Sequence, residues 1–163
     1  MTDLDQPTAG APRVPTDTQR FLLERIYLKD CSFESPLSPT VFQEPVDAPD
    51  AHVNLQTQIN ALADRPEARE VVLSVGVEAR SGERSLFVCE VQMAAVVTLD
   101  GLASSEEGAI LGARVPEALF PFARQAVCDL VVRGGFLPVM LQPIDFDAVY
   151  RQHASQQGRP LDS

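Results

Sequence analysis

Apolar and polar residues alternate along residues 22–34, which predicts a β-strand with two different faces. One face is predicted to hold Ile26, Leu28, Asp30, Ser32 and Glu34. The opposite face is mainly aromatic and apolar and holds Tyr27, Lys29, Cys31 and Phe33. The first face therefore has carboxylates and no basic residue.

Three further strands are predicted between residues 70 and 101. Residues 70–80 and 85–91 alternate on either side of the turn sequence 81–84, Ser-Gly-Glu-Arg. Residues 95–99 predict a fourth strand after a break near residues 93–95, and Asp100-Gly101 ends it. Consecutive hairpins without intervening helices indicate an antiparallel sheet.

The segment 35–58 is predicted to be a long loop because prolines interrupt it at Pro36, Pro39, Pro45 and Pro49. Loops of that length are usually functional or disordered. This one also holds apolar side chains, among them Phe42, Val46 and Leu55, so we expect it to pack on the rest of the protein.

The remaining sequence predicts helices, which makes the fold class α+β. Ser104 or Ser105 begins a short helix to about Ala113, and a longer helix runs from Pro116 to the Gly134-Gly135 pair. One apolar row of that helix is predicted to hold Leu119, Phe122, Ala126 and Leu130, beside a second row of Ala123, Val127 and Val131. So wide an apolar surface indicates oligomerisation. A last helix is predicted from an Asp145 cap to about His153, with Phe146, Val149 and Tyr150 as its apolar residues.

The 163 residues suit one domain, which we expect at 21–154 between a disordered arm (1–20) and a flexible tail (155–163). A net charge of −10 repels nucleic acid and anionic lipid and favours a basic partner, or it simply aids solubility. The three cysteines are far apart, as in reduced cytosolic proteins. The sequence shows neither a signal peptide nor an apolar run of about 20 residues, so we expect a cytoplasmic protein without membrane insertion.

Sequence motifs for catalysis are missing. His52 and His153 are not at metal-ligand spacing with cysteine, and no phosphate-binding loop, dinucleotide fingerprint or nucleophile elbow occurs. Asp145 and Asp147 are explained by helix capping. We therefore expect no cofactor, no metal and no enzymatic activity. What remains is a predicted exposed sheet face with Asp30, Glu34 and Glu90 near Leu28 and Val88, which by periodicity alone could be an ordinary solvated surface.

Four segments of the chain, in the right order, closely resemble SecB, the cytoplasmic chaperone family of bacterial protein export. The segments are Arg25 to Gln43, Leu86 to Gln92, Leu119 to Arg124, and Arg133 to Pro138 together with Pro143 to Tyr150. The resemblance implies a four-stranded antiparallel sheet with a long helix and a shorter C-terminal helix. It also implies a homotetramer, a dimer of dimers stacked through Leu119, Phe122, Ala126 and Leu130.

The same resemblance implies two binding surfaces. The positions that match the docking site for the SecA motor are Asp30, Glu34, Val88 and Glu90. The positions that match the groove for unfolded precursor proteins are Phe42, Val46, Leu55, Phe146, Val149 and Tyr150. Pro45 and Ala94-Ala95 depart from the family pattern, which has an aromatic residue and Gly-Gly there.

The expected function is that of an ATP-independent chaperone, which holds unfolded precursors and delivers them to SecA. Two alternatives remain open at this point. One is a SecB-like chaperone dedicated to a toxin–antitoxin pair, and the other is a small α+β ligand-binding domain or enzyme.

Overall fold

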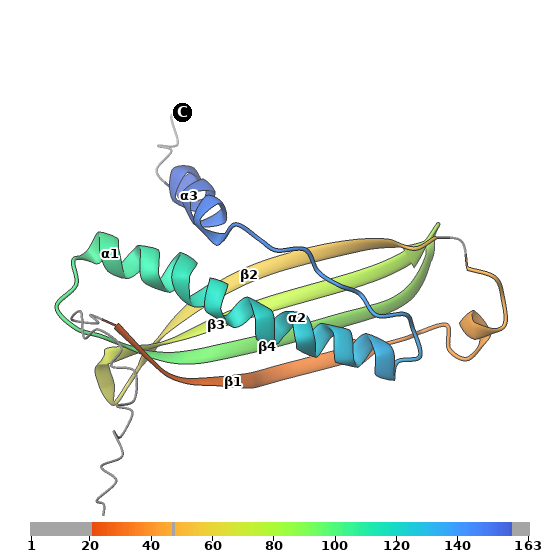
Figure 1. Cartoon of the computed structure of the whole chain (residues 1–163), viewed down its shortest axis with the longest axis horizontal. Helices are drawn as coiled ribbons and strands as arrows, with labels where there is room; N and C mark the ends of the chain where they lie inside the picture. The colour runs from red at the N-terminus through yellow and green to blue at the C-terminus, as the bar shows by residue number, and fades with distance from the viewer. Residues whose placement is uncertain (1–20, 47, 158–163) are drawn as a thin grey trace, which may run out of the picture.

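A computed structural model describes residues 21–46 and 48–157, and the expected N-terminal arm lies outside these residues. Four antiparallel strands form one sheet in the order β1-β4-β3-β2 (Figure 1). The strands are β1 (Phe21–Glu34), β2 (Asp50–Leu62), β3 (Arg65–Ser81) and β4 (Arg84–Leu99). Strand β2 pairs with β3, and β3 pairs with β4, whereas β1 pairs with β4 and not with β2.

The predicted number of strands was correct, but one strand was placed wrongly. No break occurs near residues 93–95, because β4 pairs continuously with β3 through Ala94 and Ala95, which are both fully buried. The fourth strand is β2, most of which lies in the segment expected to be a loop. The sequence of β2 does carry the strand signal, because Ala51, Val53, Leu55, Ile59 and Ala61 alternate with polar residues. The strand was missed because the prolines that precede it led to the whole segment being assigned to a loop.

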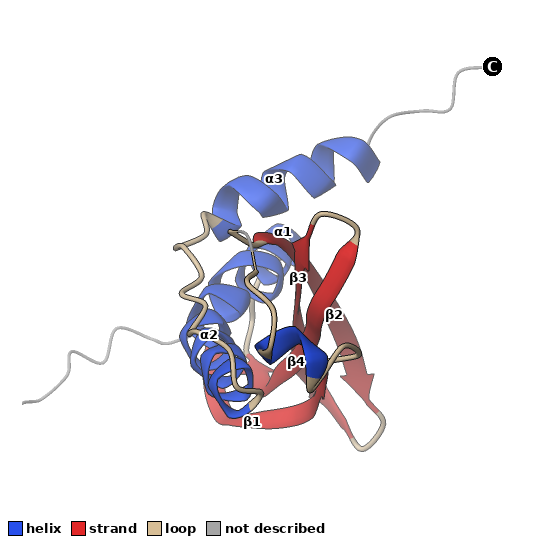
Figure 2. Cartoon of the chain, turned by 90° about the vertical axis from the view of Figure 1, so that its right-hand side faces the viewer, coloured by secondary structure: helices blue, strands red, loops and turns tan. Residues whose placement is uncertain are grey.

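Helices cover one face of this sheet. The helix α1 (Ser104–Ala109) continues through a π-helical turn, η2 (Ile110–Arg114), into α2 (Val115–Arg133), which packs on β4 and β3. A short 3-10 turn, η1 (Thr40–Phe42), precedes β2, and α3 (Phe146–Gln157) stands away from the sheet in Figure 2. Helix α3 continues beyond residue 154, into the predicted tail. None of the helices described here is long and apolar enough to cross a membrane.

The core lies between α2 and the sheet. Four residues of α2, spaced by one helical turn, are fully buried there: Leu119, Ala123, Val127 and Val131. They pack against the inner residues of β3 and β4, such as Leu73 and Val91. The predicted grouping of Leu119 with Phe122 was therefore wrong, because Phe122 lies on the neighbouring row and is half exposed.

Two β-bulges change the face on which the residues of β1 lie. The pairing with β4 shifts between Leu23 and Arg25 and again between Leu28 and Asp30. As a result Leu28 is opposite Met93, on the helix side, whereas Asp30 is opposite Gln92, on the face away from the helices. We call that second face the outer face. The predicted single alternation was wrong here, because Ile26 and Leu28 do not share a face with Asp30, Ser32 and Glu34.

A partly buried carboxylate, Glu70, connects three strands on the outer face. Glu70 of β3 accepts hydrogen bonds from Lys29 Nζ at 2.7 and 2.8 Å, from Asn60 Nδ2 at 2.9 Å, and from the Tyr27 hydroxyl. The hydrogen bonds from Lys29 and Tyr27 lower the pKa of Glu70 to about 2. Burial and the hydrogen bond to Glu70 raise the pKa of Tyr27 to about 12. The network therefore favours an ionised Glu70 and a neutral Tyr27 at neutral pH.

This network predicts a specific pH dependence of stability. Because the pKa of Glu70 is about 2 in the folded protein and about 4.5 when unperturbed, its contribution is complete above pH 4.5 and is lost as pH falls towards 2. Glu70→Gln should lower the free energy of unfolding by about 1–3 kcal/mol at pH 7, and the difference from wild type should shrink between pH 4.5 and 2. Urea unfolding at fixed protein concentration across this pH range measures it.

The matched control is Glu83→Gln in the exposed turn between β3 and β4. It should leave the pH profile unchanged. A Glu70→Gln profile parallel to that of the wild type across the whole range would contradict the assigned role.

Candidate functional site: an acidic sheet face and an apolar groove

The first candidate surface lies on the outer face, across β1 and β4. Glu34 is opposite Val88, Ser32 is opposite Glu90, and Asp30 is opposite Gln92. Directly opposed residues share a face of a sheet, so the four positions expected to dock a partner lie together. All four are exposed: Asp30, Glu34, Val88 and Glu90. Leu28, expected beside them, is on the helix side.

These carboxylates differ from the others on the same face because they lack a cation. Glu70 is paired with Lys29, Glu24 with Arg65 at 2.6 Å, and Glu78 with Arg80 at 3.0 Å. We call the surface of Asp30, Glu34, Glu90 and Val88 the acidic face. Among residues 21–46 and 48–157, no ion pair involves any of its three carboxylates. The acidic face therefore has negative charge that no basic residue in the described part of the chain neutralises.

The second candidate surface is an apolar groove on the helix side, along β2. The residues that connect α2 to α3 (134–145, here called the strap) run back along the molecule between α2 and β2 (Figure 1). Three pockets lie in a row along β2, two of them against the strap and one against α3. The middle pocket, of about 310 Å³, lies between Ala51 and Val53 of β2 and residues 139–144.

An aromatic cluster forms one end of the groove. Phe136 of the strap lies 5.0 Å from Phe87 and 5.3 Å from Phe42, measured between ring centroids. Phe42 and Val46 line an end pocket of about 380 Å³ that shares Ala51 and Val139 with the middle pocket. These shared residues make the two pockets continuous.

Helix α3 forms the other end of the groove. A pocket of about 270 Å³ lies between β2 and α3, and its lining includes Leu55, Thr57, Phe146, Val149 and Tyr150. The structure thus brings the six predicted groove residues into two groups, one at each end. Phe146 is 5% exposed and packs edge-on against Phe120 with 5.7 Å between centroids, so it anchors α3 more than it lines an open surface.

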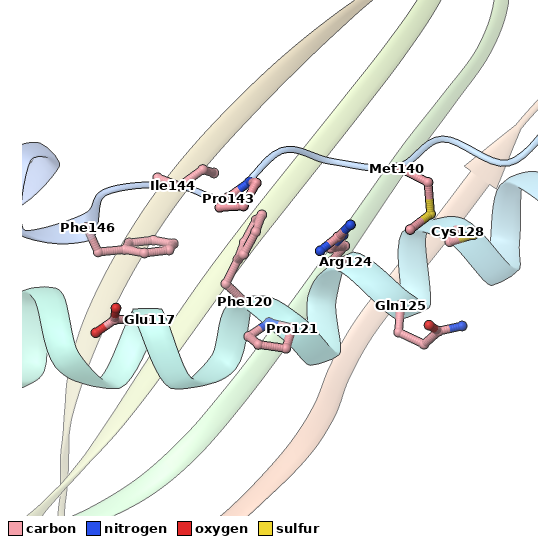
Figure 3. Close-up of a pocket in the computed structure, with 10 residues that line it drawn as sticks. All are labelled: Glu117, Phe120, Pro121, Arg124, Gln125, Cys128, Met140, Pro143, Ile144 and Phe146. Carbon is pink, nitrogen blue, oxygen red and sulfur yellow. The ribbon is translucent and has the colours of Figure 1, made fainter.

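Sequence reasoning missed the strap as a wall of the groove. Leu137 is 87% exposed and Met140 is 58% exposed, although both are large apolar residues. The sequence signal was the apolar run 136–141, which is interrupted by Pro138 and therefore reads as neither strand nor helix. Figure 3 shows Met140 directed towards α2, over a further pocket of about 440 Å³ that includes Phe120 and Arg124.

A close contact between α3 and the π-helical turn sets the width of the groove at this end. A Cβ atom built on Gly112 would lie 2.5 Å from Cδ2 of Tyr150, so the aromatic ring lies directly against the glycine backbone. Asp145 begins α3 as predicted, because its Oδ1 accepts a hydrogen bond from the Ala148 N–H at 2.9 Å.

The four residues expected to form the interface between dimers are only partly exposed. Leu119 is fully buried against the sheet of its own chain, so its predicted place in a subunit interface was wrong. Phe122 is 50% exposed, whereas Ala126 and Leu130 are partly buried at the edge of the core. The helical phase explains this difference, because Leu119 is one turn before Ala123 in the row that faces the sheet.

The titratable groups show no reactive centre in the described part of the chain. Burial raises the pKa of the Cys89 thiol to about 11, so it is protonated at neutral pH. Within residues 21–46 and 48–157, no three His, Cys, Asp or Glu side chains converge on a common point. The fold and the surfaces together define an α+β binding protein with an open apolar groove on one side and an unpaired acidic face on the other.

Comparison with known proteins identifies the family. Residues 15–157 match the family described as preprotein translocase subunit SecB. The protein-export protein SecB of Stenotrophomonas maltophilia is 41% identical over 149 residues, which cover 91% of this chain and 85% of that protein. That of Marinobacter nauticus is 44% identical over 133 residues, which cover 82% and 79%. The chain belongs to the SecB family, whose role is that of a chaperone in protein export.

A solved structure has the same fold. A SecB-like chaperone of Mycobacterium tuberculosis, in complex with a peptide from an antitoxin, superposes with a TM-score of 0.64. The match covers 77% of this chain and 91% of that one, at 19% sequence identity.

The contact between Gly112 and Tyr150 gives a testable prediction. Gly112→Ala should push the Tyr150 ring away and loosen α3, at a cost of about 1–3 kcal/mol as in other overpacked sites. Hydrogen exchange should show faster exchange of the α3 amides, and thermal unfolding should show lower stability.

The control is the same change in a Tyr150→Ala background. There the added methyl group has space, and alanine favours a helix over glycine. Gly112→Ala should then be neutral or stabilising. Equal destabilisation in both backgrounds would mean that Gly112 is needed for another reason.

Proposed function

We propose that the groove holds extended segments of unfolded precursor proteins and that the acidic face docks the SecA motor, to which the chain delivers them. The observation that carries the proposal is the separation of the two surfaces. The groove lies on the helix side along β2, and the acidic face lies on the outer face across β1 and β4. A precursor and the motor could therefore bind at the same time. We propose that the protein acts in the cytoplasm.

The shape of the groove favours unfolded chains over native proteins. Its pockets follow β2 from Ala51 to Ile59, and the eight steps between these residues span about 26 Å at the usual strand rise. An extended segment of similar length could place separate side chains in the three pockets. A native protein buries such side chains and does not present them in a row.

One groove should bind weakly. Burial of a large apolar side chain contributes about 1.5–3 kcal/mol, and ordering an unfolded segment opposes much of that gain. Tight binding of a precursor then requires that several grooves bind the same long unfolded chain.

We infer that several grooves come together in a homotetramer, a dimer of dimers. Phe122, with Ala126 and Leu130 beside it, supports an interface along α2, because Phe122 is a large apolar side chain left half exposed on this helix. Four chains of 17.7 kDa would present four grooves to one precursor.

The acidic face suits a basic partner. Single exposed ion pairs contribute only about 0.2–1 kcal/mol each, so no one carboxylate should dominate. Three unpaired carboxylates within a few residues should instead accelerate association and make it sensitive to salt.

A dedicated toxin–antitoxin chaperone is the second candidate. The Mycobacterium tuberculosis chaperone, solved with an antitoxin peptide, has the same fold, but that likeness at 19% identity concerns the fold alone. The unpaired acidic face favours the export function, because a chaperone for one antitoxin would not need a motor-docking surface.

The groove proposal predicts a loss of precursor binding in a double variant. Phe42→Ala with Met140→Ala removes two groove side chains that are already more than half exposed, so folding should change little. The dissociation constant for an unfolded model precursor should rise about tenfold or more, the equivalent of 1.4 kcal/mol. Fluorescence anisotropy with a labelled precursor measures it.

The control for this variant truncates two apolar residues of the outer face, Leu22→Ala with Val88→Ala. They are similarly exposed and lie outside the groove. If both double variants bind the precursor as wild type does, the binding site is not this groove.

The docking proposal predicts salt-sensitive binding of SecA. The triple variant Asp30→Asn, Glu34→Gln, Glu90→Gln changes the net charge from −10 to −7 and should abolish binding. The wild type should bind strongly at about 0.01 M salt, where the Debye length is about 30 Å, and much more weakly at 0.15 M, where it is about 8 Å. Titration calorimetry at both salt concentrations measures this.

A matched control removes the same charge elsewhere. Asp64→Asn, Glu83→Gln and Asp100→Asn change three exposed carboxylates in turns, also from −10 to −7. This variant should bind SecA nearly as well as wild type. Light scattering should give the same assembly mass, and precursor binding should be unchanged for both triple variants. Salt-insensitive binding by the first triple variant would contradict the docking site.

A further inference from the structure

A glycine lies in the middle of the outer face without a structural reason for it in this chain. Gly76 is opposite Glu90 on one side and Asn54 on the other, in the same cross-strand row as Ser32. The neighbouring residues of β3, Val75 and Val77, point to the other face and are fully buried. Gly76 therefore leaves a gap between the Glu90 and Asn54 side chains on the outer face.

The fold does not need glycine at this position. The pairing with β2 and with β4 continues through Gly76 without a register shift, so no bulge requires it. Its φ angle is not positive. A Cβ atom would meet only Asn54, at 3.9 Å from its Cβ and 4.0 Å from its carbonyl oxygen, which is ordinary contact.

Glycine inside a strand weakens folding relative to alanine. A strand glycine that serves neither a bulge nor a bend often marks a place where a ligand or another backbone approaches closely. The position next to Glu90 makes a ligand of the acidic face the natural candidate.

We propose that Gly76 is a specificity-determining residue of the docking surface, where a lysine or arginine side chain of the motor lies across the glycine backbone with its charge on Glu90. This inference rests on the docking function proposed above and adds a residue to it. The apolar stem of such a side chain would cover the exposed backbone, as long basic side chains commonly do.

The geometry of the sheet supports this placement. Neighbouring strands are about 4.8 Å apart, so a cation over β3 is within reach of the Glu90 carboxylate on β4. The row continues to Ser32 on β1, which lies between Asp30 and Glu34. The gap thus leads from the β2 side towards the three unpaired carboxylates.

The experiment fills the gap without changing any charge. Gly76→Thr adds a β-branched side chain, which strands favour, and should raise the melting temperature by about 1–4 °C. It should weaken SecA binding at low salt by about tenfold or more, because the basic side chain can no longer lie over β3. Gly76→Ala, with less bulk, should show a smaller loss. Precursor binding should be unchanged, because the groove is on the other side of the sheet.

The matched control is Ala61→Thr, which adds the same kind of side chain to an exposed position of β2 opposite Arg69 and on the helix-side face. It should leave SecA binding unchanged. A Gly76→Thr protein that binds SecA as tightly as wild type, while the triple charge variant does not, would overturn the role of Gly76 and leave the docking site in place. If the triple charge variant also binds as wild type does, the docking function itself is wrong.

Discussion

The difference in width between one helix and a four-stranded sheet determines the surfaces of this protein. Four strands about 4.8 Å apart have axes that span about 14 Å, whereas a helix with its side chains is about 10–12 Å wide. Helix α2 packs on β4 and β3, so the inner side of β2 is left for the strap and α3 (Figure 2). These two segments cover it only in part, because their contacts leave three pockets along β2. The groove is therefore a direct consequence of a layer of helices that is too narrow for its sheet.

The bulges of β1 separate this apolar side from the acidic one. Without the bulge after Leu28, strict alternation would place Leu28 on the same face as Asp30. With it, the apolar residues before and after the bulge, such as Ile26 and Phe33, both turn towards the helices. The outer face then keeps Asp30 and Glu34 next to Glu90. One extra residue in the edge strand β1 thus allows this strand to place apolar residues on the helix side and carboxylates on the outer face.

The sequence predicted those features that depend on local pattern and on family resemblance. The antiparallel sheet, the long helix ended by Gly134 and the Asp145 cap follow from alternation, periodicity and capping. Prediction from sequence failed where contacts between distant parts of the chain determine the structure. The break expected in β4 is a buried alanine pair, and the row of Leu119 depends on a helical phase that one residue can change. Strand β2 is a different case, because its regular alternation was present in the sequence but was assigned to the proline-rich loop that precedes it. Asp30 and Glu34 share the outer face, as alternation predicts, because both follow the second bulge and parity between them is preserved.

The outer face has two kinds of carboxylate, those that form ion pairs between strands and those that form none with the described residues. Glu24 and Glu70 each bridge strands through a basic residue of this chain, and both have a pKa lowered to about 2. Their negative charge is compensated within the fold, so a partner gains little from them. Asp30, Glu34 and Glu90 stabilise no strand pairing through an ion pair among the described residues, and like charges this close oppose one another. Carboxylates that add no ion pair to their own sheet, beside a glycine that strands disfavour, are what the proposed docking of a basic partner would require.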